Sequence, residues 1–157
     1  MHLKTPPANL ITQLLTSSRA SLAQTSLPYS NSSLGITSIL LRHGLISSIS
    51  KGSPSKPDPT AFESLPLPSR RLWIDLKHRQ GQPVLRNISL VSKASKRVTV
   101  TKEELGRLLT GRRAKNVGGV GLGEVLIVRD VEGQNGYLEG WEAWRKGIGG
   151  EVVCRAG

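Results

Sequence analysis

The chain has 157 residues, which is enough for one domain or two small ones. Its formal net charge of +11 favours a polyanionic partner, most often a nucleic acid. A single cysteine, Cys154, excludes a disulfide framework and a cysteine-based zinc cluster, and no apolar run is long enough to span a bilayer.

The first third of the chain lacks acidic residues and is rich in serine and threonine. Asp58 is the first carboxylate in the sequence. Acid-poor, serine-rich and amphipathic segments are typical of mitochondrial targeting sequences, and an RNA-facing domain has the same composition. Both interpretations stay open at this point.

Two helices are predicted in this acid-free region. The first begins near Pro7, because proline is tolerated in the first turn of a helix. Its apolar stripe consists of Leu10, Ile11, Leu14 and Leu15. The second stripe consists of Ile36, Ile39 and Leu40. Residues 30–33 supply N-cap candidates for this second helix, and Gly44 stands where a left-handed C-cap residue belongs.

A proline-rich segment and a strand complete the first half. Residues 51–69 contain five prolines and are predicted to form an extended loop with little order. Residues 72–78 alternate strictly, with Leu72, Ile74 and Leu76 on one face of a strand. Gly81 and Pro83 then break the pattern, so we expect an N-terminal domain over residues 1–80 and a C-terminal domain over 84–157.

The second half is predicted to be mostly strands with one helix. Strands are expected within residues 84–91, at 98–100 and at 125–128. Thr101 and Glu104 form a capping box, and the helix that follows it ends at Gly111. The predicted fold class is therefore α+β with two small domains, the first with the order α-β-α-β-β and the second mostly β.

The segment 141–154 has the most distinctive sequence. Trp141 and Trp144 share one face of a short helical turn, where packing against the core is favoured over stacking on bases. Three glycines follow, and they would let backbone approach another surface closely. Glu151 comes next, where a carboxylate in a basic region suggests an acceptor for the amino group of a base.

Several segments resemble the S8 family, the eighth protein of the small ribosomal subunit. The strongest match is Lys146-Gly-Ile-Gly-Gly-Glu151, which is similar to the family's G-x-G-G-E signature. Further matches, in the family's order, are Ile74-Asp-Leu-Lys-His78, Val91-Ser-Lys93 with Arg97-Val98, and Arg107-Leu-Leu-Thr-Gly111.

Two departures from the family pattern lie between residues 112 and 136. The family's Ser-Thr-Ser-x-Gly loop is absent: counted from the left its place falls at residues 128–130, and counted back from Gly150 it falls at 132–134. Arg129, Gln134 and Asn135 are candidate replacement donors. The chain is also longer after Gly111, where a basic run and a glycine-rich connector at 118–123 fill the extra length.

The resemblance implies a structural protein of the mitochondrial small ribosomal subunit, bound to ribosomes in the matrix, that binds a central-domain helix of the rRNA and performs no catalysis. The implied partners are this rRNA and neighbouring small-subunit proteins, with no membrane, metal, cofactor or small-molecule substrate. The alternative is a non-ribosomal organellar RNA-binding module that regulates transcripts. The candidate RNA-binding residues are Lys93, Arg97, Arg112, Arg113, Lys115, Arg129, Gln134, Asn135, Arg145, Lys146, Gly147, Gly149, Gly150 and Glu151.

Overall fold

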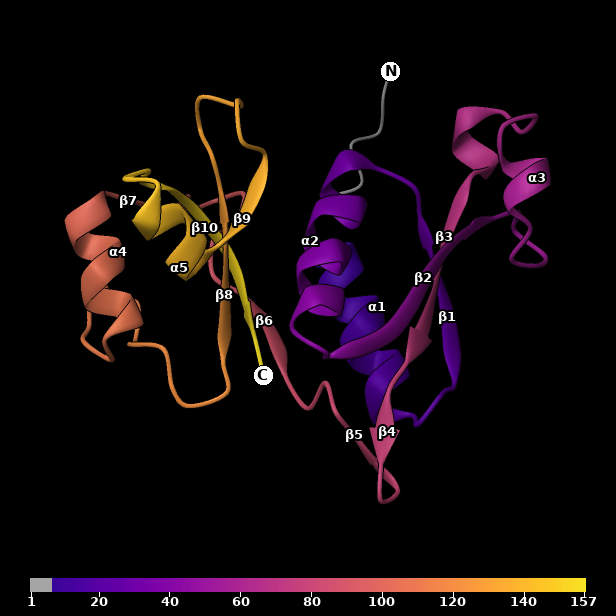
Figure 1. Ribbon diagram of the computed structural model, residues 1–157, viewed down its shortest axis with the longest axis horizontal. Helices are drawn as coiled ribbons and strands as arrows, with labels where there is room; N and C mark the ends of the chain where they lie inside the picture. Colours follow the sequence, from indigo (N-terminus) through magenta and orange to yellow (C-terminus); the bar gives the residue numbers. More distant parts are fainter. Residues whose placement is uncertain (1–6) are drawn as a thin grey trace. The chain divides into compact units, whose positions relative to one another are not determined.

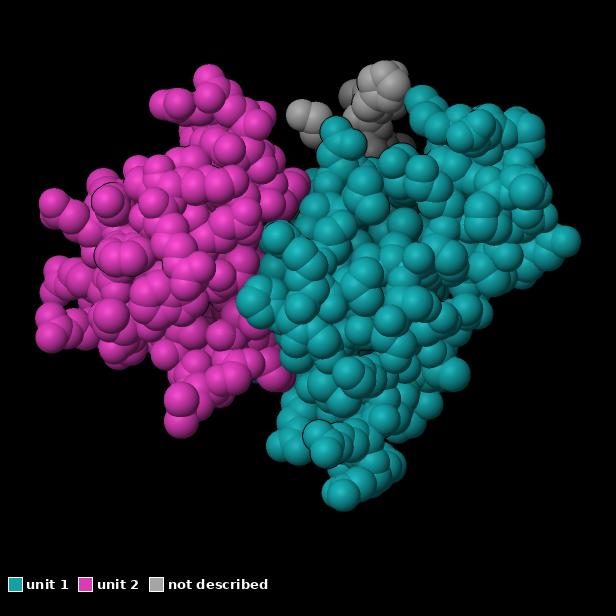
Figure 2. Space-filling model, in the orientation of Figure 1, with its two compact units in different colours: residues 1–87 teal, residues 88–157 magenta. Residues whose placement is uncertain are grey.

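A computed structural model describes residues 7–157 of the chain. It divides into two compact units, the first ending at Asn87 and the second spanning Ile88–Gly157. Figure 1 shows the elements of each unit, and Figure 2 shows the two units in separate colours. The α+β fold class expected from the sequence is confirmed.

Unit 1 combines two helices with a three-stranded antiparallel sheet of order β1-β3-β2, which α1 and α2 cover on one face (Figure 1). A short hairpin, β4 with β5, follows the sheet. In chain order the elements are α1 (Pro7–Arg19), β1 (Gln24–Pro28), α2 (Asn31–Arg42), β2 (Ile46–Gly52), α3 (Pro59–Phe62), a 3-10 turn (Leu67–Ser69), β3 (Arg71–Leu76), β4 (His78–Arg79) and β5 (Gln82–Pro83).

The predicted stripes and caps of the two helices are present in unit 1. Leu10, Ile11 and Leu14 of α1 are buried and the fourth predicted residue, Leu15, is half-buried, while the three apolar residues predicted for α2 are all buried. The Ser30 hydroxyl accepts a hydrogen bond from the backbone N–H of Ser33 at the start of α2. Gly44 follows the helix with φ +72°, the left-handed conformation expected there.

The proline-rich segment is folded, which corrects the expectation of an extended loop with little order. The Asp58 carboxylate caps α3 by accepting from the N–H groups of Thr60 and Ala61. Phe62 is buried, with Tyr29 edge-on at 4.9 Å between ring centroids and the Arg70 guanidinium 5.0 Å from its ring. One buried aromatic ring therefore anchors a segment whose composition alone predicts disorder.

Unit 2 is built on an antiparallel sheet with β10 in its centre. The path is β6-β10-β8-β9, and β7 also pairs with β10. Helices α4 and α5 pack against each other and against this sheet (Figure 1). The elements are β6 (Ile88–Leu90), β7 (Thr99–Val100), α4 (Lys102–Leu109), β8 (Val125–Arg129), β9 (Tyr137–Glu139), α5 (Gly140–Arg145) and β10 (Gly150–Ala156).

The helices of unit 2 begin at side-chain caps, a threonine hydroxyl at α4 and a carboxylate at α5. The Thr101 and Glu104 capping box is present as predicted at α4. At α5 the Glu139 carboxylate accepts from the N–H groups of Trp141 and Glu142, a cap that the sequence reading did not identify. Fixing the start of α5 in this way also fixes the direction from which the glycine segment after it enters β10.

The two tryptophans of α5 lie on the surface, so the expectation of core packing is wrong. Trp141 is 41% exposed and Trp144 is 38% exposed. Their rings meet edge to face at 5.9 Å between centroids. Trp144 also covers Gly106 of α4, and the Lys102 ammonium lies 5.8 Å from its ring. The apolar residue that α5 buries is Ala143, because the small side chain lets the helix approach the sheet closely.

Candidate nucleic-acid interface

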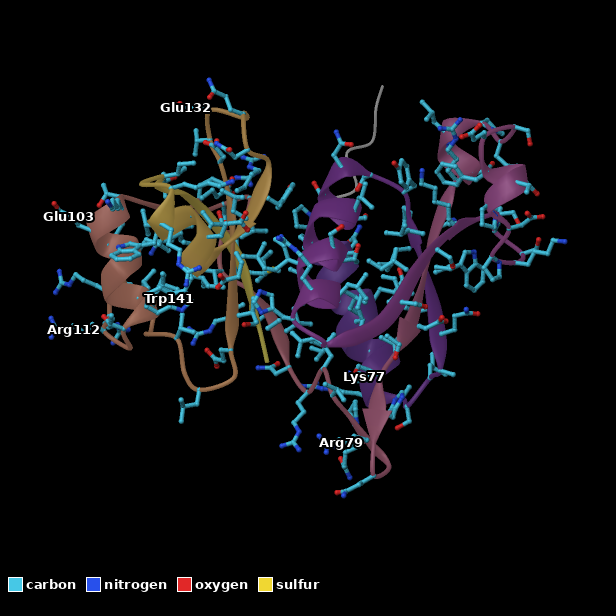
Figure 3. All side chains as sticks on the ribbon, in the orientation of Figure 1. Lys77, Arg79, Glu103, Arg112, Glu132 and Trp141 are labelled. Atoms are coloured by element: carbon cyan, nitrogen blue, oxygen red, sulfur yellow. The ribbon has the colours of Figure 1, made fainter. Side chains whose placement is uncertain are left out.

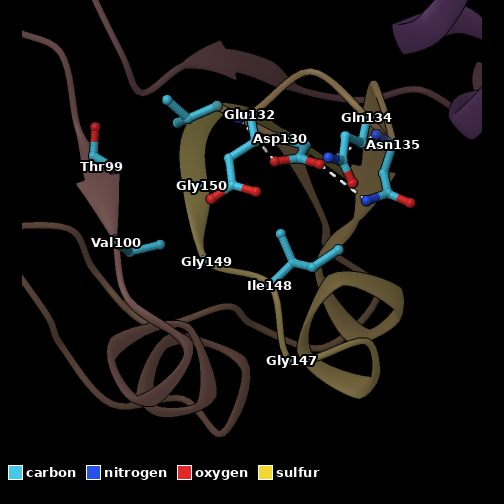
Figure 4. Close-up of a pocket in the computed structure, with 11 residues that line it drawn as sticks. Thr99, Val100, Asp130, Glu132, Gln134, Asn135, Gly147, Ile148, Gly149 and Gly150 are labelled. Carbon is cyan, nitrogen blue, oxygen red and sulfur yellow. Dashed lines mark hydrogen bonds between the residues drawn. The ribbon is translucent and has the colours of Figure 1, made fainter.

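A pocket of about 460 Å³ opens in unit 2 where the loop after β8 faces the glycine segment before β10 (Figure 4). We call it the glycine pocket. It is lined by Thr99, Val100, Asp130, Val131, Glu132, Gln134, Asn135 and residues 147–150. Two amide side chains, a stretch of backbone and two carboxylates line it, so it offers hydrogen-bonding groups rather than positive charge.

Asp130 organises one wall of the glycine pocket. Its carboxylate accepts from the backbone N–H of Glu132, and from both the backbone N–H and the side-chain amide of Asn135, at 2.9–3.1 Å. These hydrogen bonds, the Asn135 side-chain bond foremost, hold the pKa of Asp130 below its usual value. Because the loop is closed by its own aspartate, Gln134 and Asn135 occupy defined positions at the pocket rim (Figure 4).

The three glycines of the opposite wall have structural roles in their own unit. Gly147 has φ +73°, a conformation that other residues rarely adopt. A Cβ on Gly149 would lie 2.5 Å from the carbonyl oxygen of Val100, and a Cβ on Gly150 would overlap the carbonyl oxygen of Arg129. Gly149 and Gly150 therefore permit tight packing against β7 and β8. The sequence pattern instead predicted that they would let the backbone approach another molecule closely.

Glu151 is buried, with 4% of its surface exposed, and both carboxylate oxygens accept hydrogen bonds from the protein. Oε1 accepts from the Ser92 hydroxyl at 2.7 Å and from the Arg97 guanidinium at 2.8 Å, and Oε2 accepts from the Arg129 guanidinium at 2.5 Å. We call these four residues the Glu151 cluster. The carboxylate thus occupies an internal position, and its direct role is to orient two arginines.

The two arginines of the cluster keep much of their surface in solvent. The Arg97 side chain is 60% exposed and the Arg129 side chain is 46% exposed. Thr99 pairs with Glu151 in the sheet, and Asp130 follows Arg129, so the cluster adjoins the glycine pocket along three neighbouring strands. The unit therefore presents two fixed guanidinium groups beside a pocket of neutral and acidic hydrogen-bonding groups.

The ionisation of Glu151 links the cluster to pH. Burial alone would raise the pKa of Glu151, but the hydrogen bonds from Ser92 and Arg97 and the charge of Arg129 outweigh it, so the pKa lies below the ordinary 4.5. A lowered carboxylate pKa contributes stability that is present above the ordinary pKa and is lost as the pH falls through the folded-state value.

We therefore expect the protein to lose part of its stability below about pH 4.5. The variant Glu151→Gln should lack the part of this pH-dependent loss that comes from the Glu151 carboxylate. Urea denaturation of both proteins between about pH 3 and 7 measures this difference, since the linkage predicts different pH slopes. If the free energies of unfolding of the two proteins changed in parallel over that pH range, the lowered pKa could not be assigned to Glu151.

The remaining candidate residues do not converge on the glycine pocket. Arg112 and Arg113 are exposed in the turn after α4, where Arg112 lies on the outside of the unit (Figure 3). Arg145 and Lys146 are exposed at the end of α5, and the Lys146 ammonium lies 3.5 Å from Glu142. Lys93 and Lys115 line a different pocket. The structure thus separates the predicted set into the pocket, the cluster and dispersed surface cations.

Two important residues were not identified from the sequence. Asp130 could have been found, because an aspartate followed within six residues by Asn-Gly is a turn signal. Ser92 lies in the Val91-Ser-Lys93 match, but nothing in the sequence indicates its hydrogen bond. Its role depends on Glu151, which is 59 residues away in the chain.

Among residues 7–157, no side chains are arranged for metal binding or for thiol chemistry. No three His, Cys, Asp or Glu side chains in this range are placed to hold a metal ion. Burial raises the pKa of the Cys154 thiol to about 12, so this cysteine is unreactive at neutral pH. Within the same range, no helix is both apolar and long enough to cross a membrane.

The fold and this site define a small, basic α+β protein. One of its surfaces combines a pocket of hydrogen-bonding groups with two arginines that a buried carboxylate orients. The family of ribosomal protein S8 matches the chain over residues 5–156, and the chain belongs to this family. Its members are structural ribosomal proteins and not enzymes.

Two curated relatives carry the name small ribosomal subunit protein uS8m. The one from Neurospora crassa is 39% identical over 155 residues, which cover 94% of each chain. The one from Schizosaccharomyces pombe is 36% identical over 148 residues, which cover 93% of this chain and 95% of the relative. Identity at this level over nearly the full length of both chains agrees with the resemblance drawn from four short motifs.

Proposed function

We propose that the chain is a structural constituent of the mitochondrial small ribosomal subunit, and that unit 2 binds a helix of the central domain of the small-subunit rRNA. The names of its relatives place those proteins in the small ribosomal subunit and support the same role here. Neighbouring small-subunit proteins are the second class of partner, and the exposed pair Trp141 and Trp144 is a candidate contact for them.

The observation that carries the RNA proposal is the Glu151 cluster beside the glycine pocket. Two arginines held by one buried carboxylate are fixed in direction before RNA arrives, so less side-chain entropy is lost on binding. Guanidinium groups bind phosphate oxygens well because their N–H groups match the spacing of those oxygens. The cluster therefore fits the RNA backbone.

The glycine pocket suits the edges of bases. The amides of Gln134 and Asn135 can each donate and accept, and backbone groups of residues 147–150 line the opposite wall. The carboxylates of Asp130 and Glu132 disfavour phosphate inside the pocket, and the exposed carboxylate of Glu132 can accept from base amino groups. Phosphates at the rim would then position the RNA, and bases in the pocket would specify it.

The salt dependence of binding tests whether phosphate contacts supply most of the affinity, as this division between rim and pocket requires. A protein that neutralises six to ten phosphates should lose roughly three to five decades of affinity between about 50 and 200 mM salt. We expect a slope in this range for the full chain with a fragment of the rRNA central domain, measured by fluorescence anisotropy. The double variant R97Q/R129Q should flatten the slope by about two phosphate contacts. A shallow slope for the unmodified protein would contradict the proposal.

Sedimentation separates a ribosomal role from an organellar RNA-binding module that acts on transcripts. A structural constituent is expected to co-migrate with the small subunit in a gradient at high salt, because many contacts hold it in place. A transcript regulator would leave the particle and remain near the top of the gradient. The second result would favour the alternative and would leave the fold assignment unchanged.

A further inference from the structure

A second pocket in unit 2 has the opposite electrostatic character to the glycine pocket. It has a volume of about 370 Å³ and is lined by the β6 segment, the turn at residues 93–96, and the turn at residues 114–118. Its polar side chains are Ser89, Lys93, Lys96, Lys115, Asn116 and Arg155. We call it the lysine pocket. Four cations line it, and no aspartate or glutamate is among its lining residues.

Lys93 and Lys96 are held opposite each other. Each backbone N–H donates to the carbonyl of the other, at 3.0 and 3.1 Å, and the two residues form an isolated antiparallel bridge. Residues directly opposite in such a bridge place their side chains on the same face, where like charges are destabilising. Within residues 7–157, neither ammonium has an ion pair or a hydrogen-bond acceptor. An anion between them would remove this repulsion.

The other cations of the lysine pocket are already engaged. The Arg155 guanidinium pairs with Glu124 and donates to the carbonyls of Gly118 and Gly119 at 3.0 and 2.9 Å. The Lys115 ammonium donates to the carbonyl of Thr99 at 2.6 Å and lies 3.3 Å from Glu104. Arg155 and Lys115 therefore fix the wall of the pocket, and the uncompensated charge belongs to the opposed lysine pair.

The turn that carries Lys115 is tight and adds a polar group to the pocket. Ala114 and Val117 form a second isolated bridge, and Lys115 and Asn116 between them have φ +45° and φ +62°. Two central residues with positive φ are typical of a tight hairpin turn, which asparagine tolerates well. The turn places the Asn116 side chain at the pocket, where Ser89 also lies.

We propose that the lysine pocket binds the sugar–phosphate backbone of an RNA strand as a second contact, separate from the glycine pocket. Lys93 and Lys96 would hold a phosphate, and the Ser89 hydroxyl and the Asn116 amide can hydrogen-bond a ribose 2′-hydroxyl, the group that distinguishes RNA from DNA. This inference rests on the proposed RNA partner. Val98 lines the lysine pocket while Thr99 and Val100 line the glycine pocket, so one short segment shapes both contacts.

The double variant K93Q/K96Q tests the phosphate contact in the full chain. With the same central-domain rRNA fragment, we expect the slope of log affinity against log salt to become shallower by about one, because the two lysines share one phosphate. The loss in affinity should be similar for an unrelated RNA hairpin, because phosphate contacts carry no sequence information. An unchanged slope would overturn the second site.

The matched control is K56Q/R79Q, which removes the same charge from two exposed positions of unit 1. Its slope of log affinity against log salt should differ from that of the unmodified protein by less than about half of one phosphate contact. An equal change in both double variants would mean that net charge alone sets the slope, and would also overturn the second site. Failure of the broader RNA proposal looks different, because the unmodified protein would then bind the rRNA fragment weakly and with a shallow slope.

Backbone amide shifts recorded by NMR localise the contact independently of affinity. On addition of the rRNA fragment, we expect shifts at Ser89 and Asn116 as well as at Gly149 and Gly150. In K93Q/K96Q the shifts at the glycine pocket should persist while those at Ser89 and Asn116 diminish. Shifts confined to the glycine pocket in the unmodified protein would contradict the second site and would leave the first one standing.

Discussion

Gly150→Ala should lower the free energy of unfolding of unit 2 by about 3 kcal/mol, near the top of the usual range for overpacking. The added methyl group would overlap the carbonyl oxygen of Arg129 and lie 3.0 Å from Cγ1 of Val128. The first of these atoms is backbone of β8, which cannot rotate away as the end of a side chain can. Gly150 also begins β10, the strand that pairs with three others in the sheet.

Urea denaturation followed by tryptophan fluorescence measures this loss. Gly121→Ala is the matched control, because its added methyl group meets only the Glu124 side chain at 3.7 Å or more and its φ is not positive. The control should change stability by less than about 0.5 kcal/mol or raise it slightly. If Gly150→Ala proves as stable as the control, the glycine is not required for packing, and close approach to RNA regains its place as the explanation.

Glu151→Ala should cost about 2–3 kcal/mol of stability and also weaken binding to the cognate RNA. Removing one member of a buried ion pair typically costs 3–5 kcal/mol, because a buried charge is left alone. Here the stranded charges are Arg97 and Arg129, whose exposed surfaces let water solvate them, so we expect a smaller loss. Ser92 would lose its buried acceptor as well.

The effect on RNA should be selective. The arginines keep their charge in Glu151→Ala but lose the carboxylate that orients them, so attraction to any RNA persists while the fixed geometry is lost. We expect roughly tenfold weaker binding to the central-domain fragment and little change for an unrelated hairpin, equal to about 1.4 kcal/mol of discrimination. Anisotropy titrations at one salt concentration, at a temperature where the variant is folded, measure both. Equal losses on the two RNAs would assign Glu151 to folding alone.

The sequence predicted best those elements whose signals are local. The apolar stripe of α1, the Thr101 capping box and the alternation of Leu72, Ile74 and Leu76 each depend on neighbours within a few residues, and each is present. The proline-rich segment was misread because proline content reports on the backbone alone. Phe62 orders the segment by burial among Tyr29 and residues distant in the chain, and composition does not show such contacts.

The motif Lys146–Glu151 coincides with the features on which the RNA proposal rests, since its glycines line a pocket and Glu151 contacts two arginines. The sequence could not show that the carboxylate points inward, because its three donors lie 22 to 59 residues away. The outward tryptophans were missed for a related reason. Only the assembled helix pair shows that Ala143, rather than either aromatic ring, faces the sheet.

The central place of β10 has a consequence for the order in which the protein folds during synthesis. Unit 1 contains all the strands of its own sheet by residue 76 and can form while translation continues. In unit 2, β6, β7 and β8 all pair with β10, which is made last. Until residues 150–156 emerge, those strands keep open edges that invite pairing with other chains. Nascent unit 2 should therefore depend on chaperones for longer than unit 1.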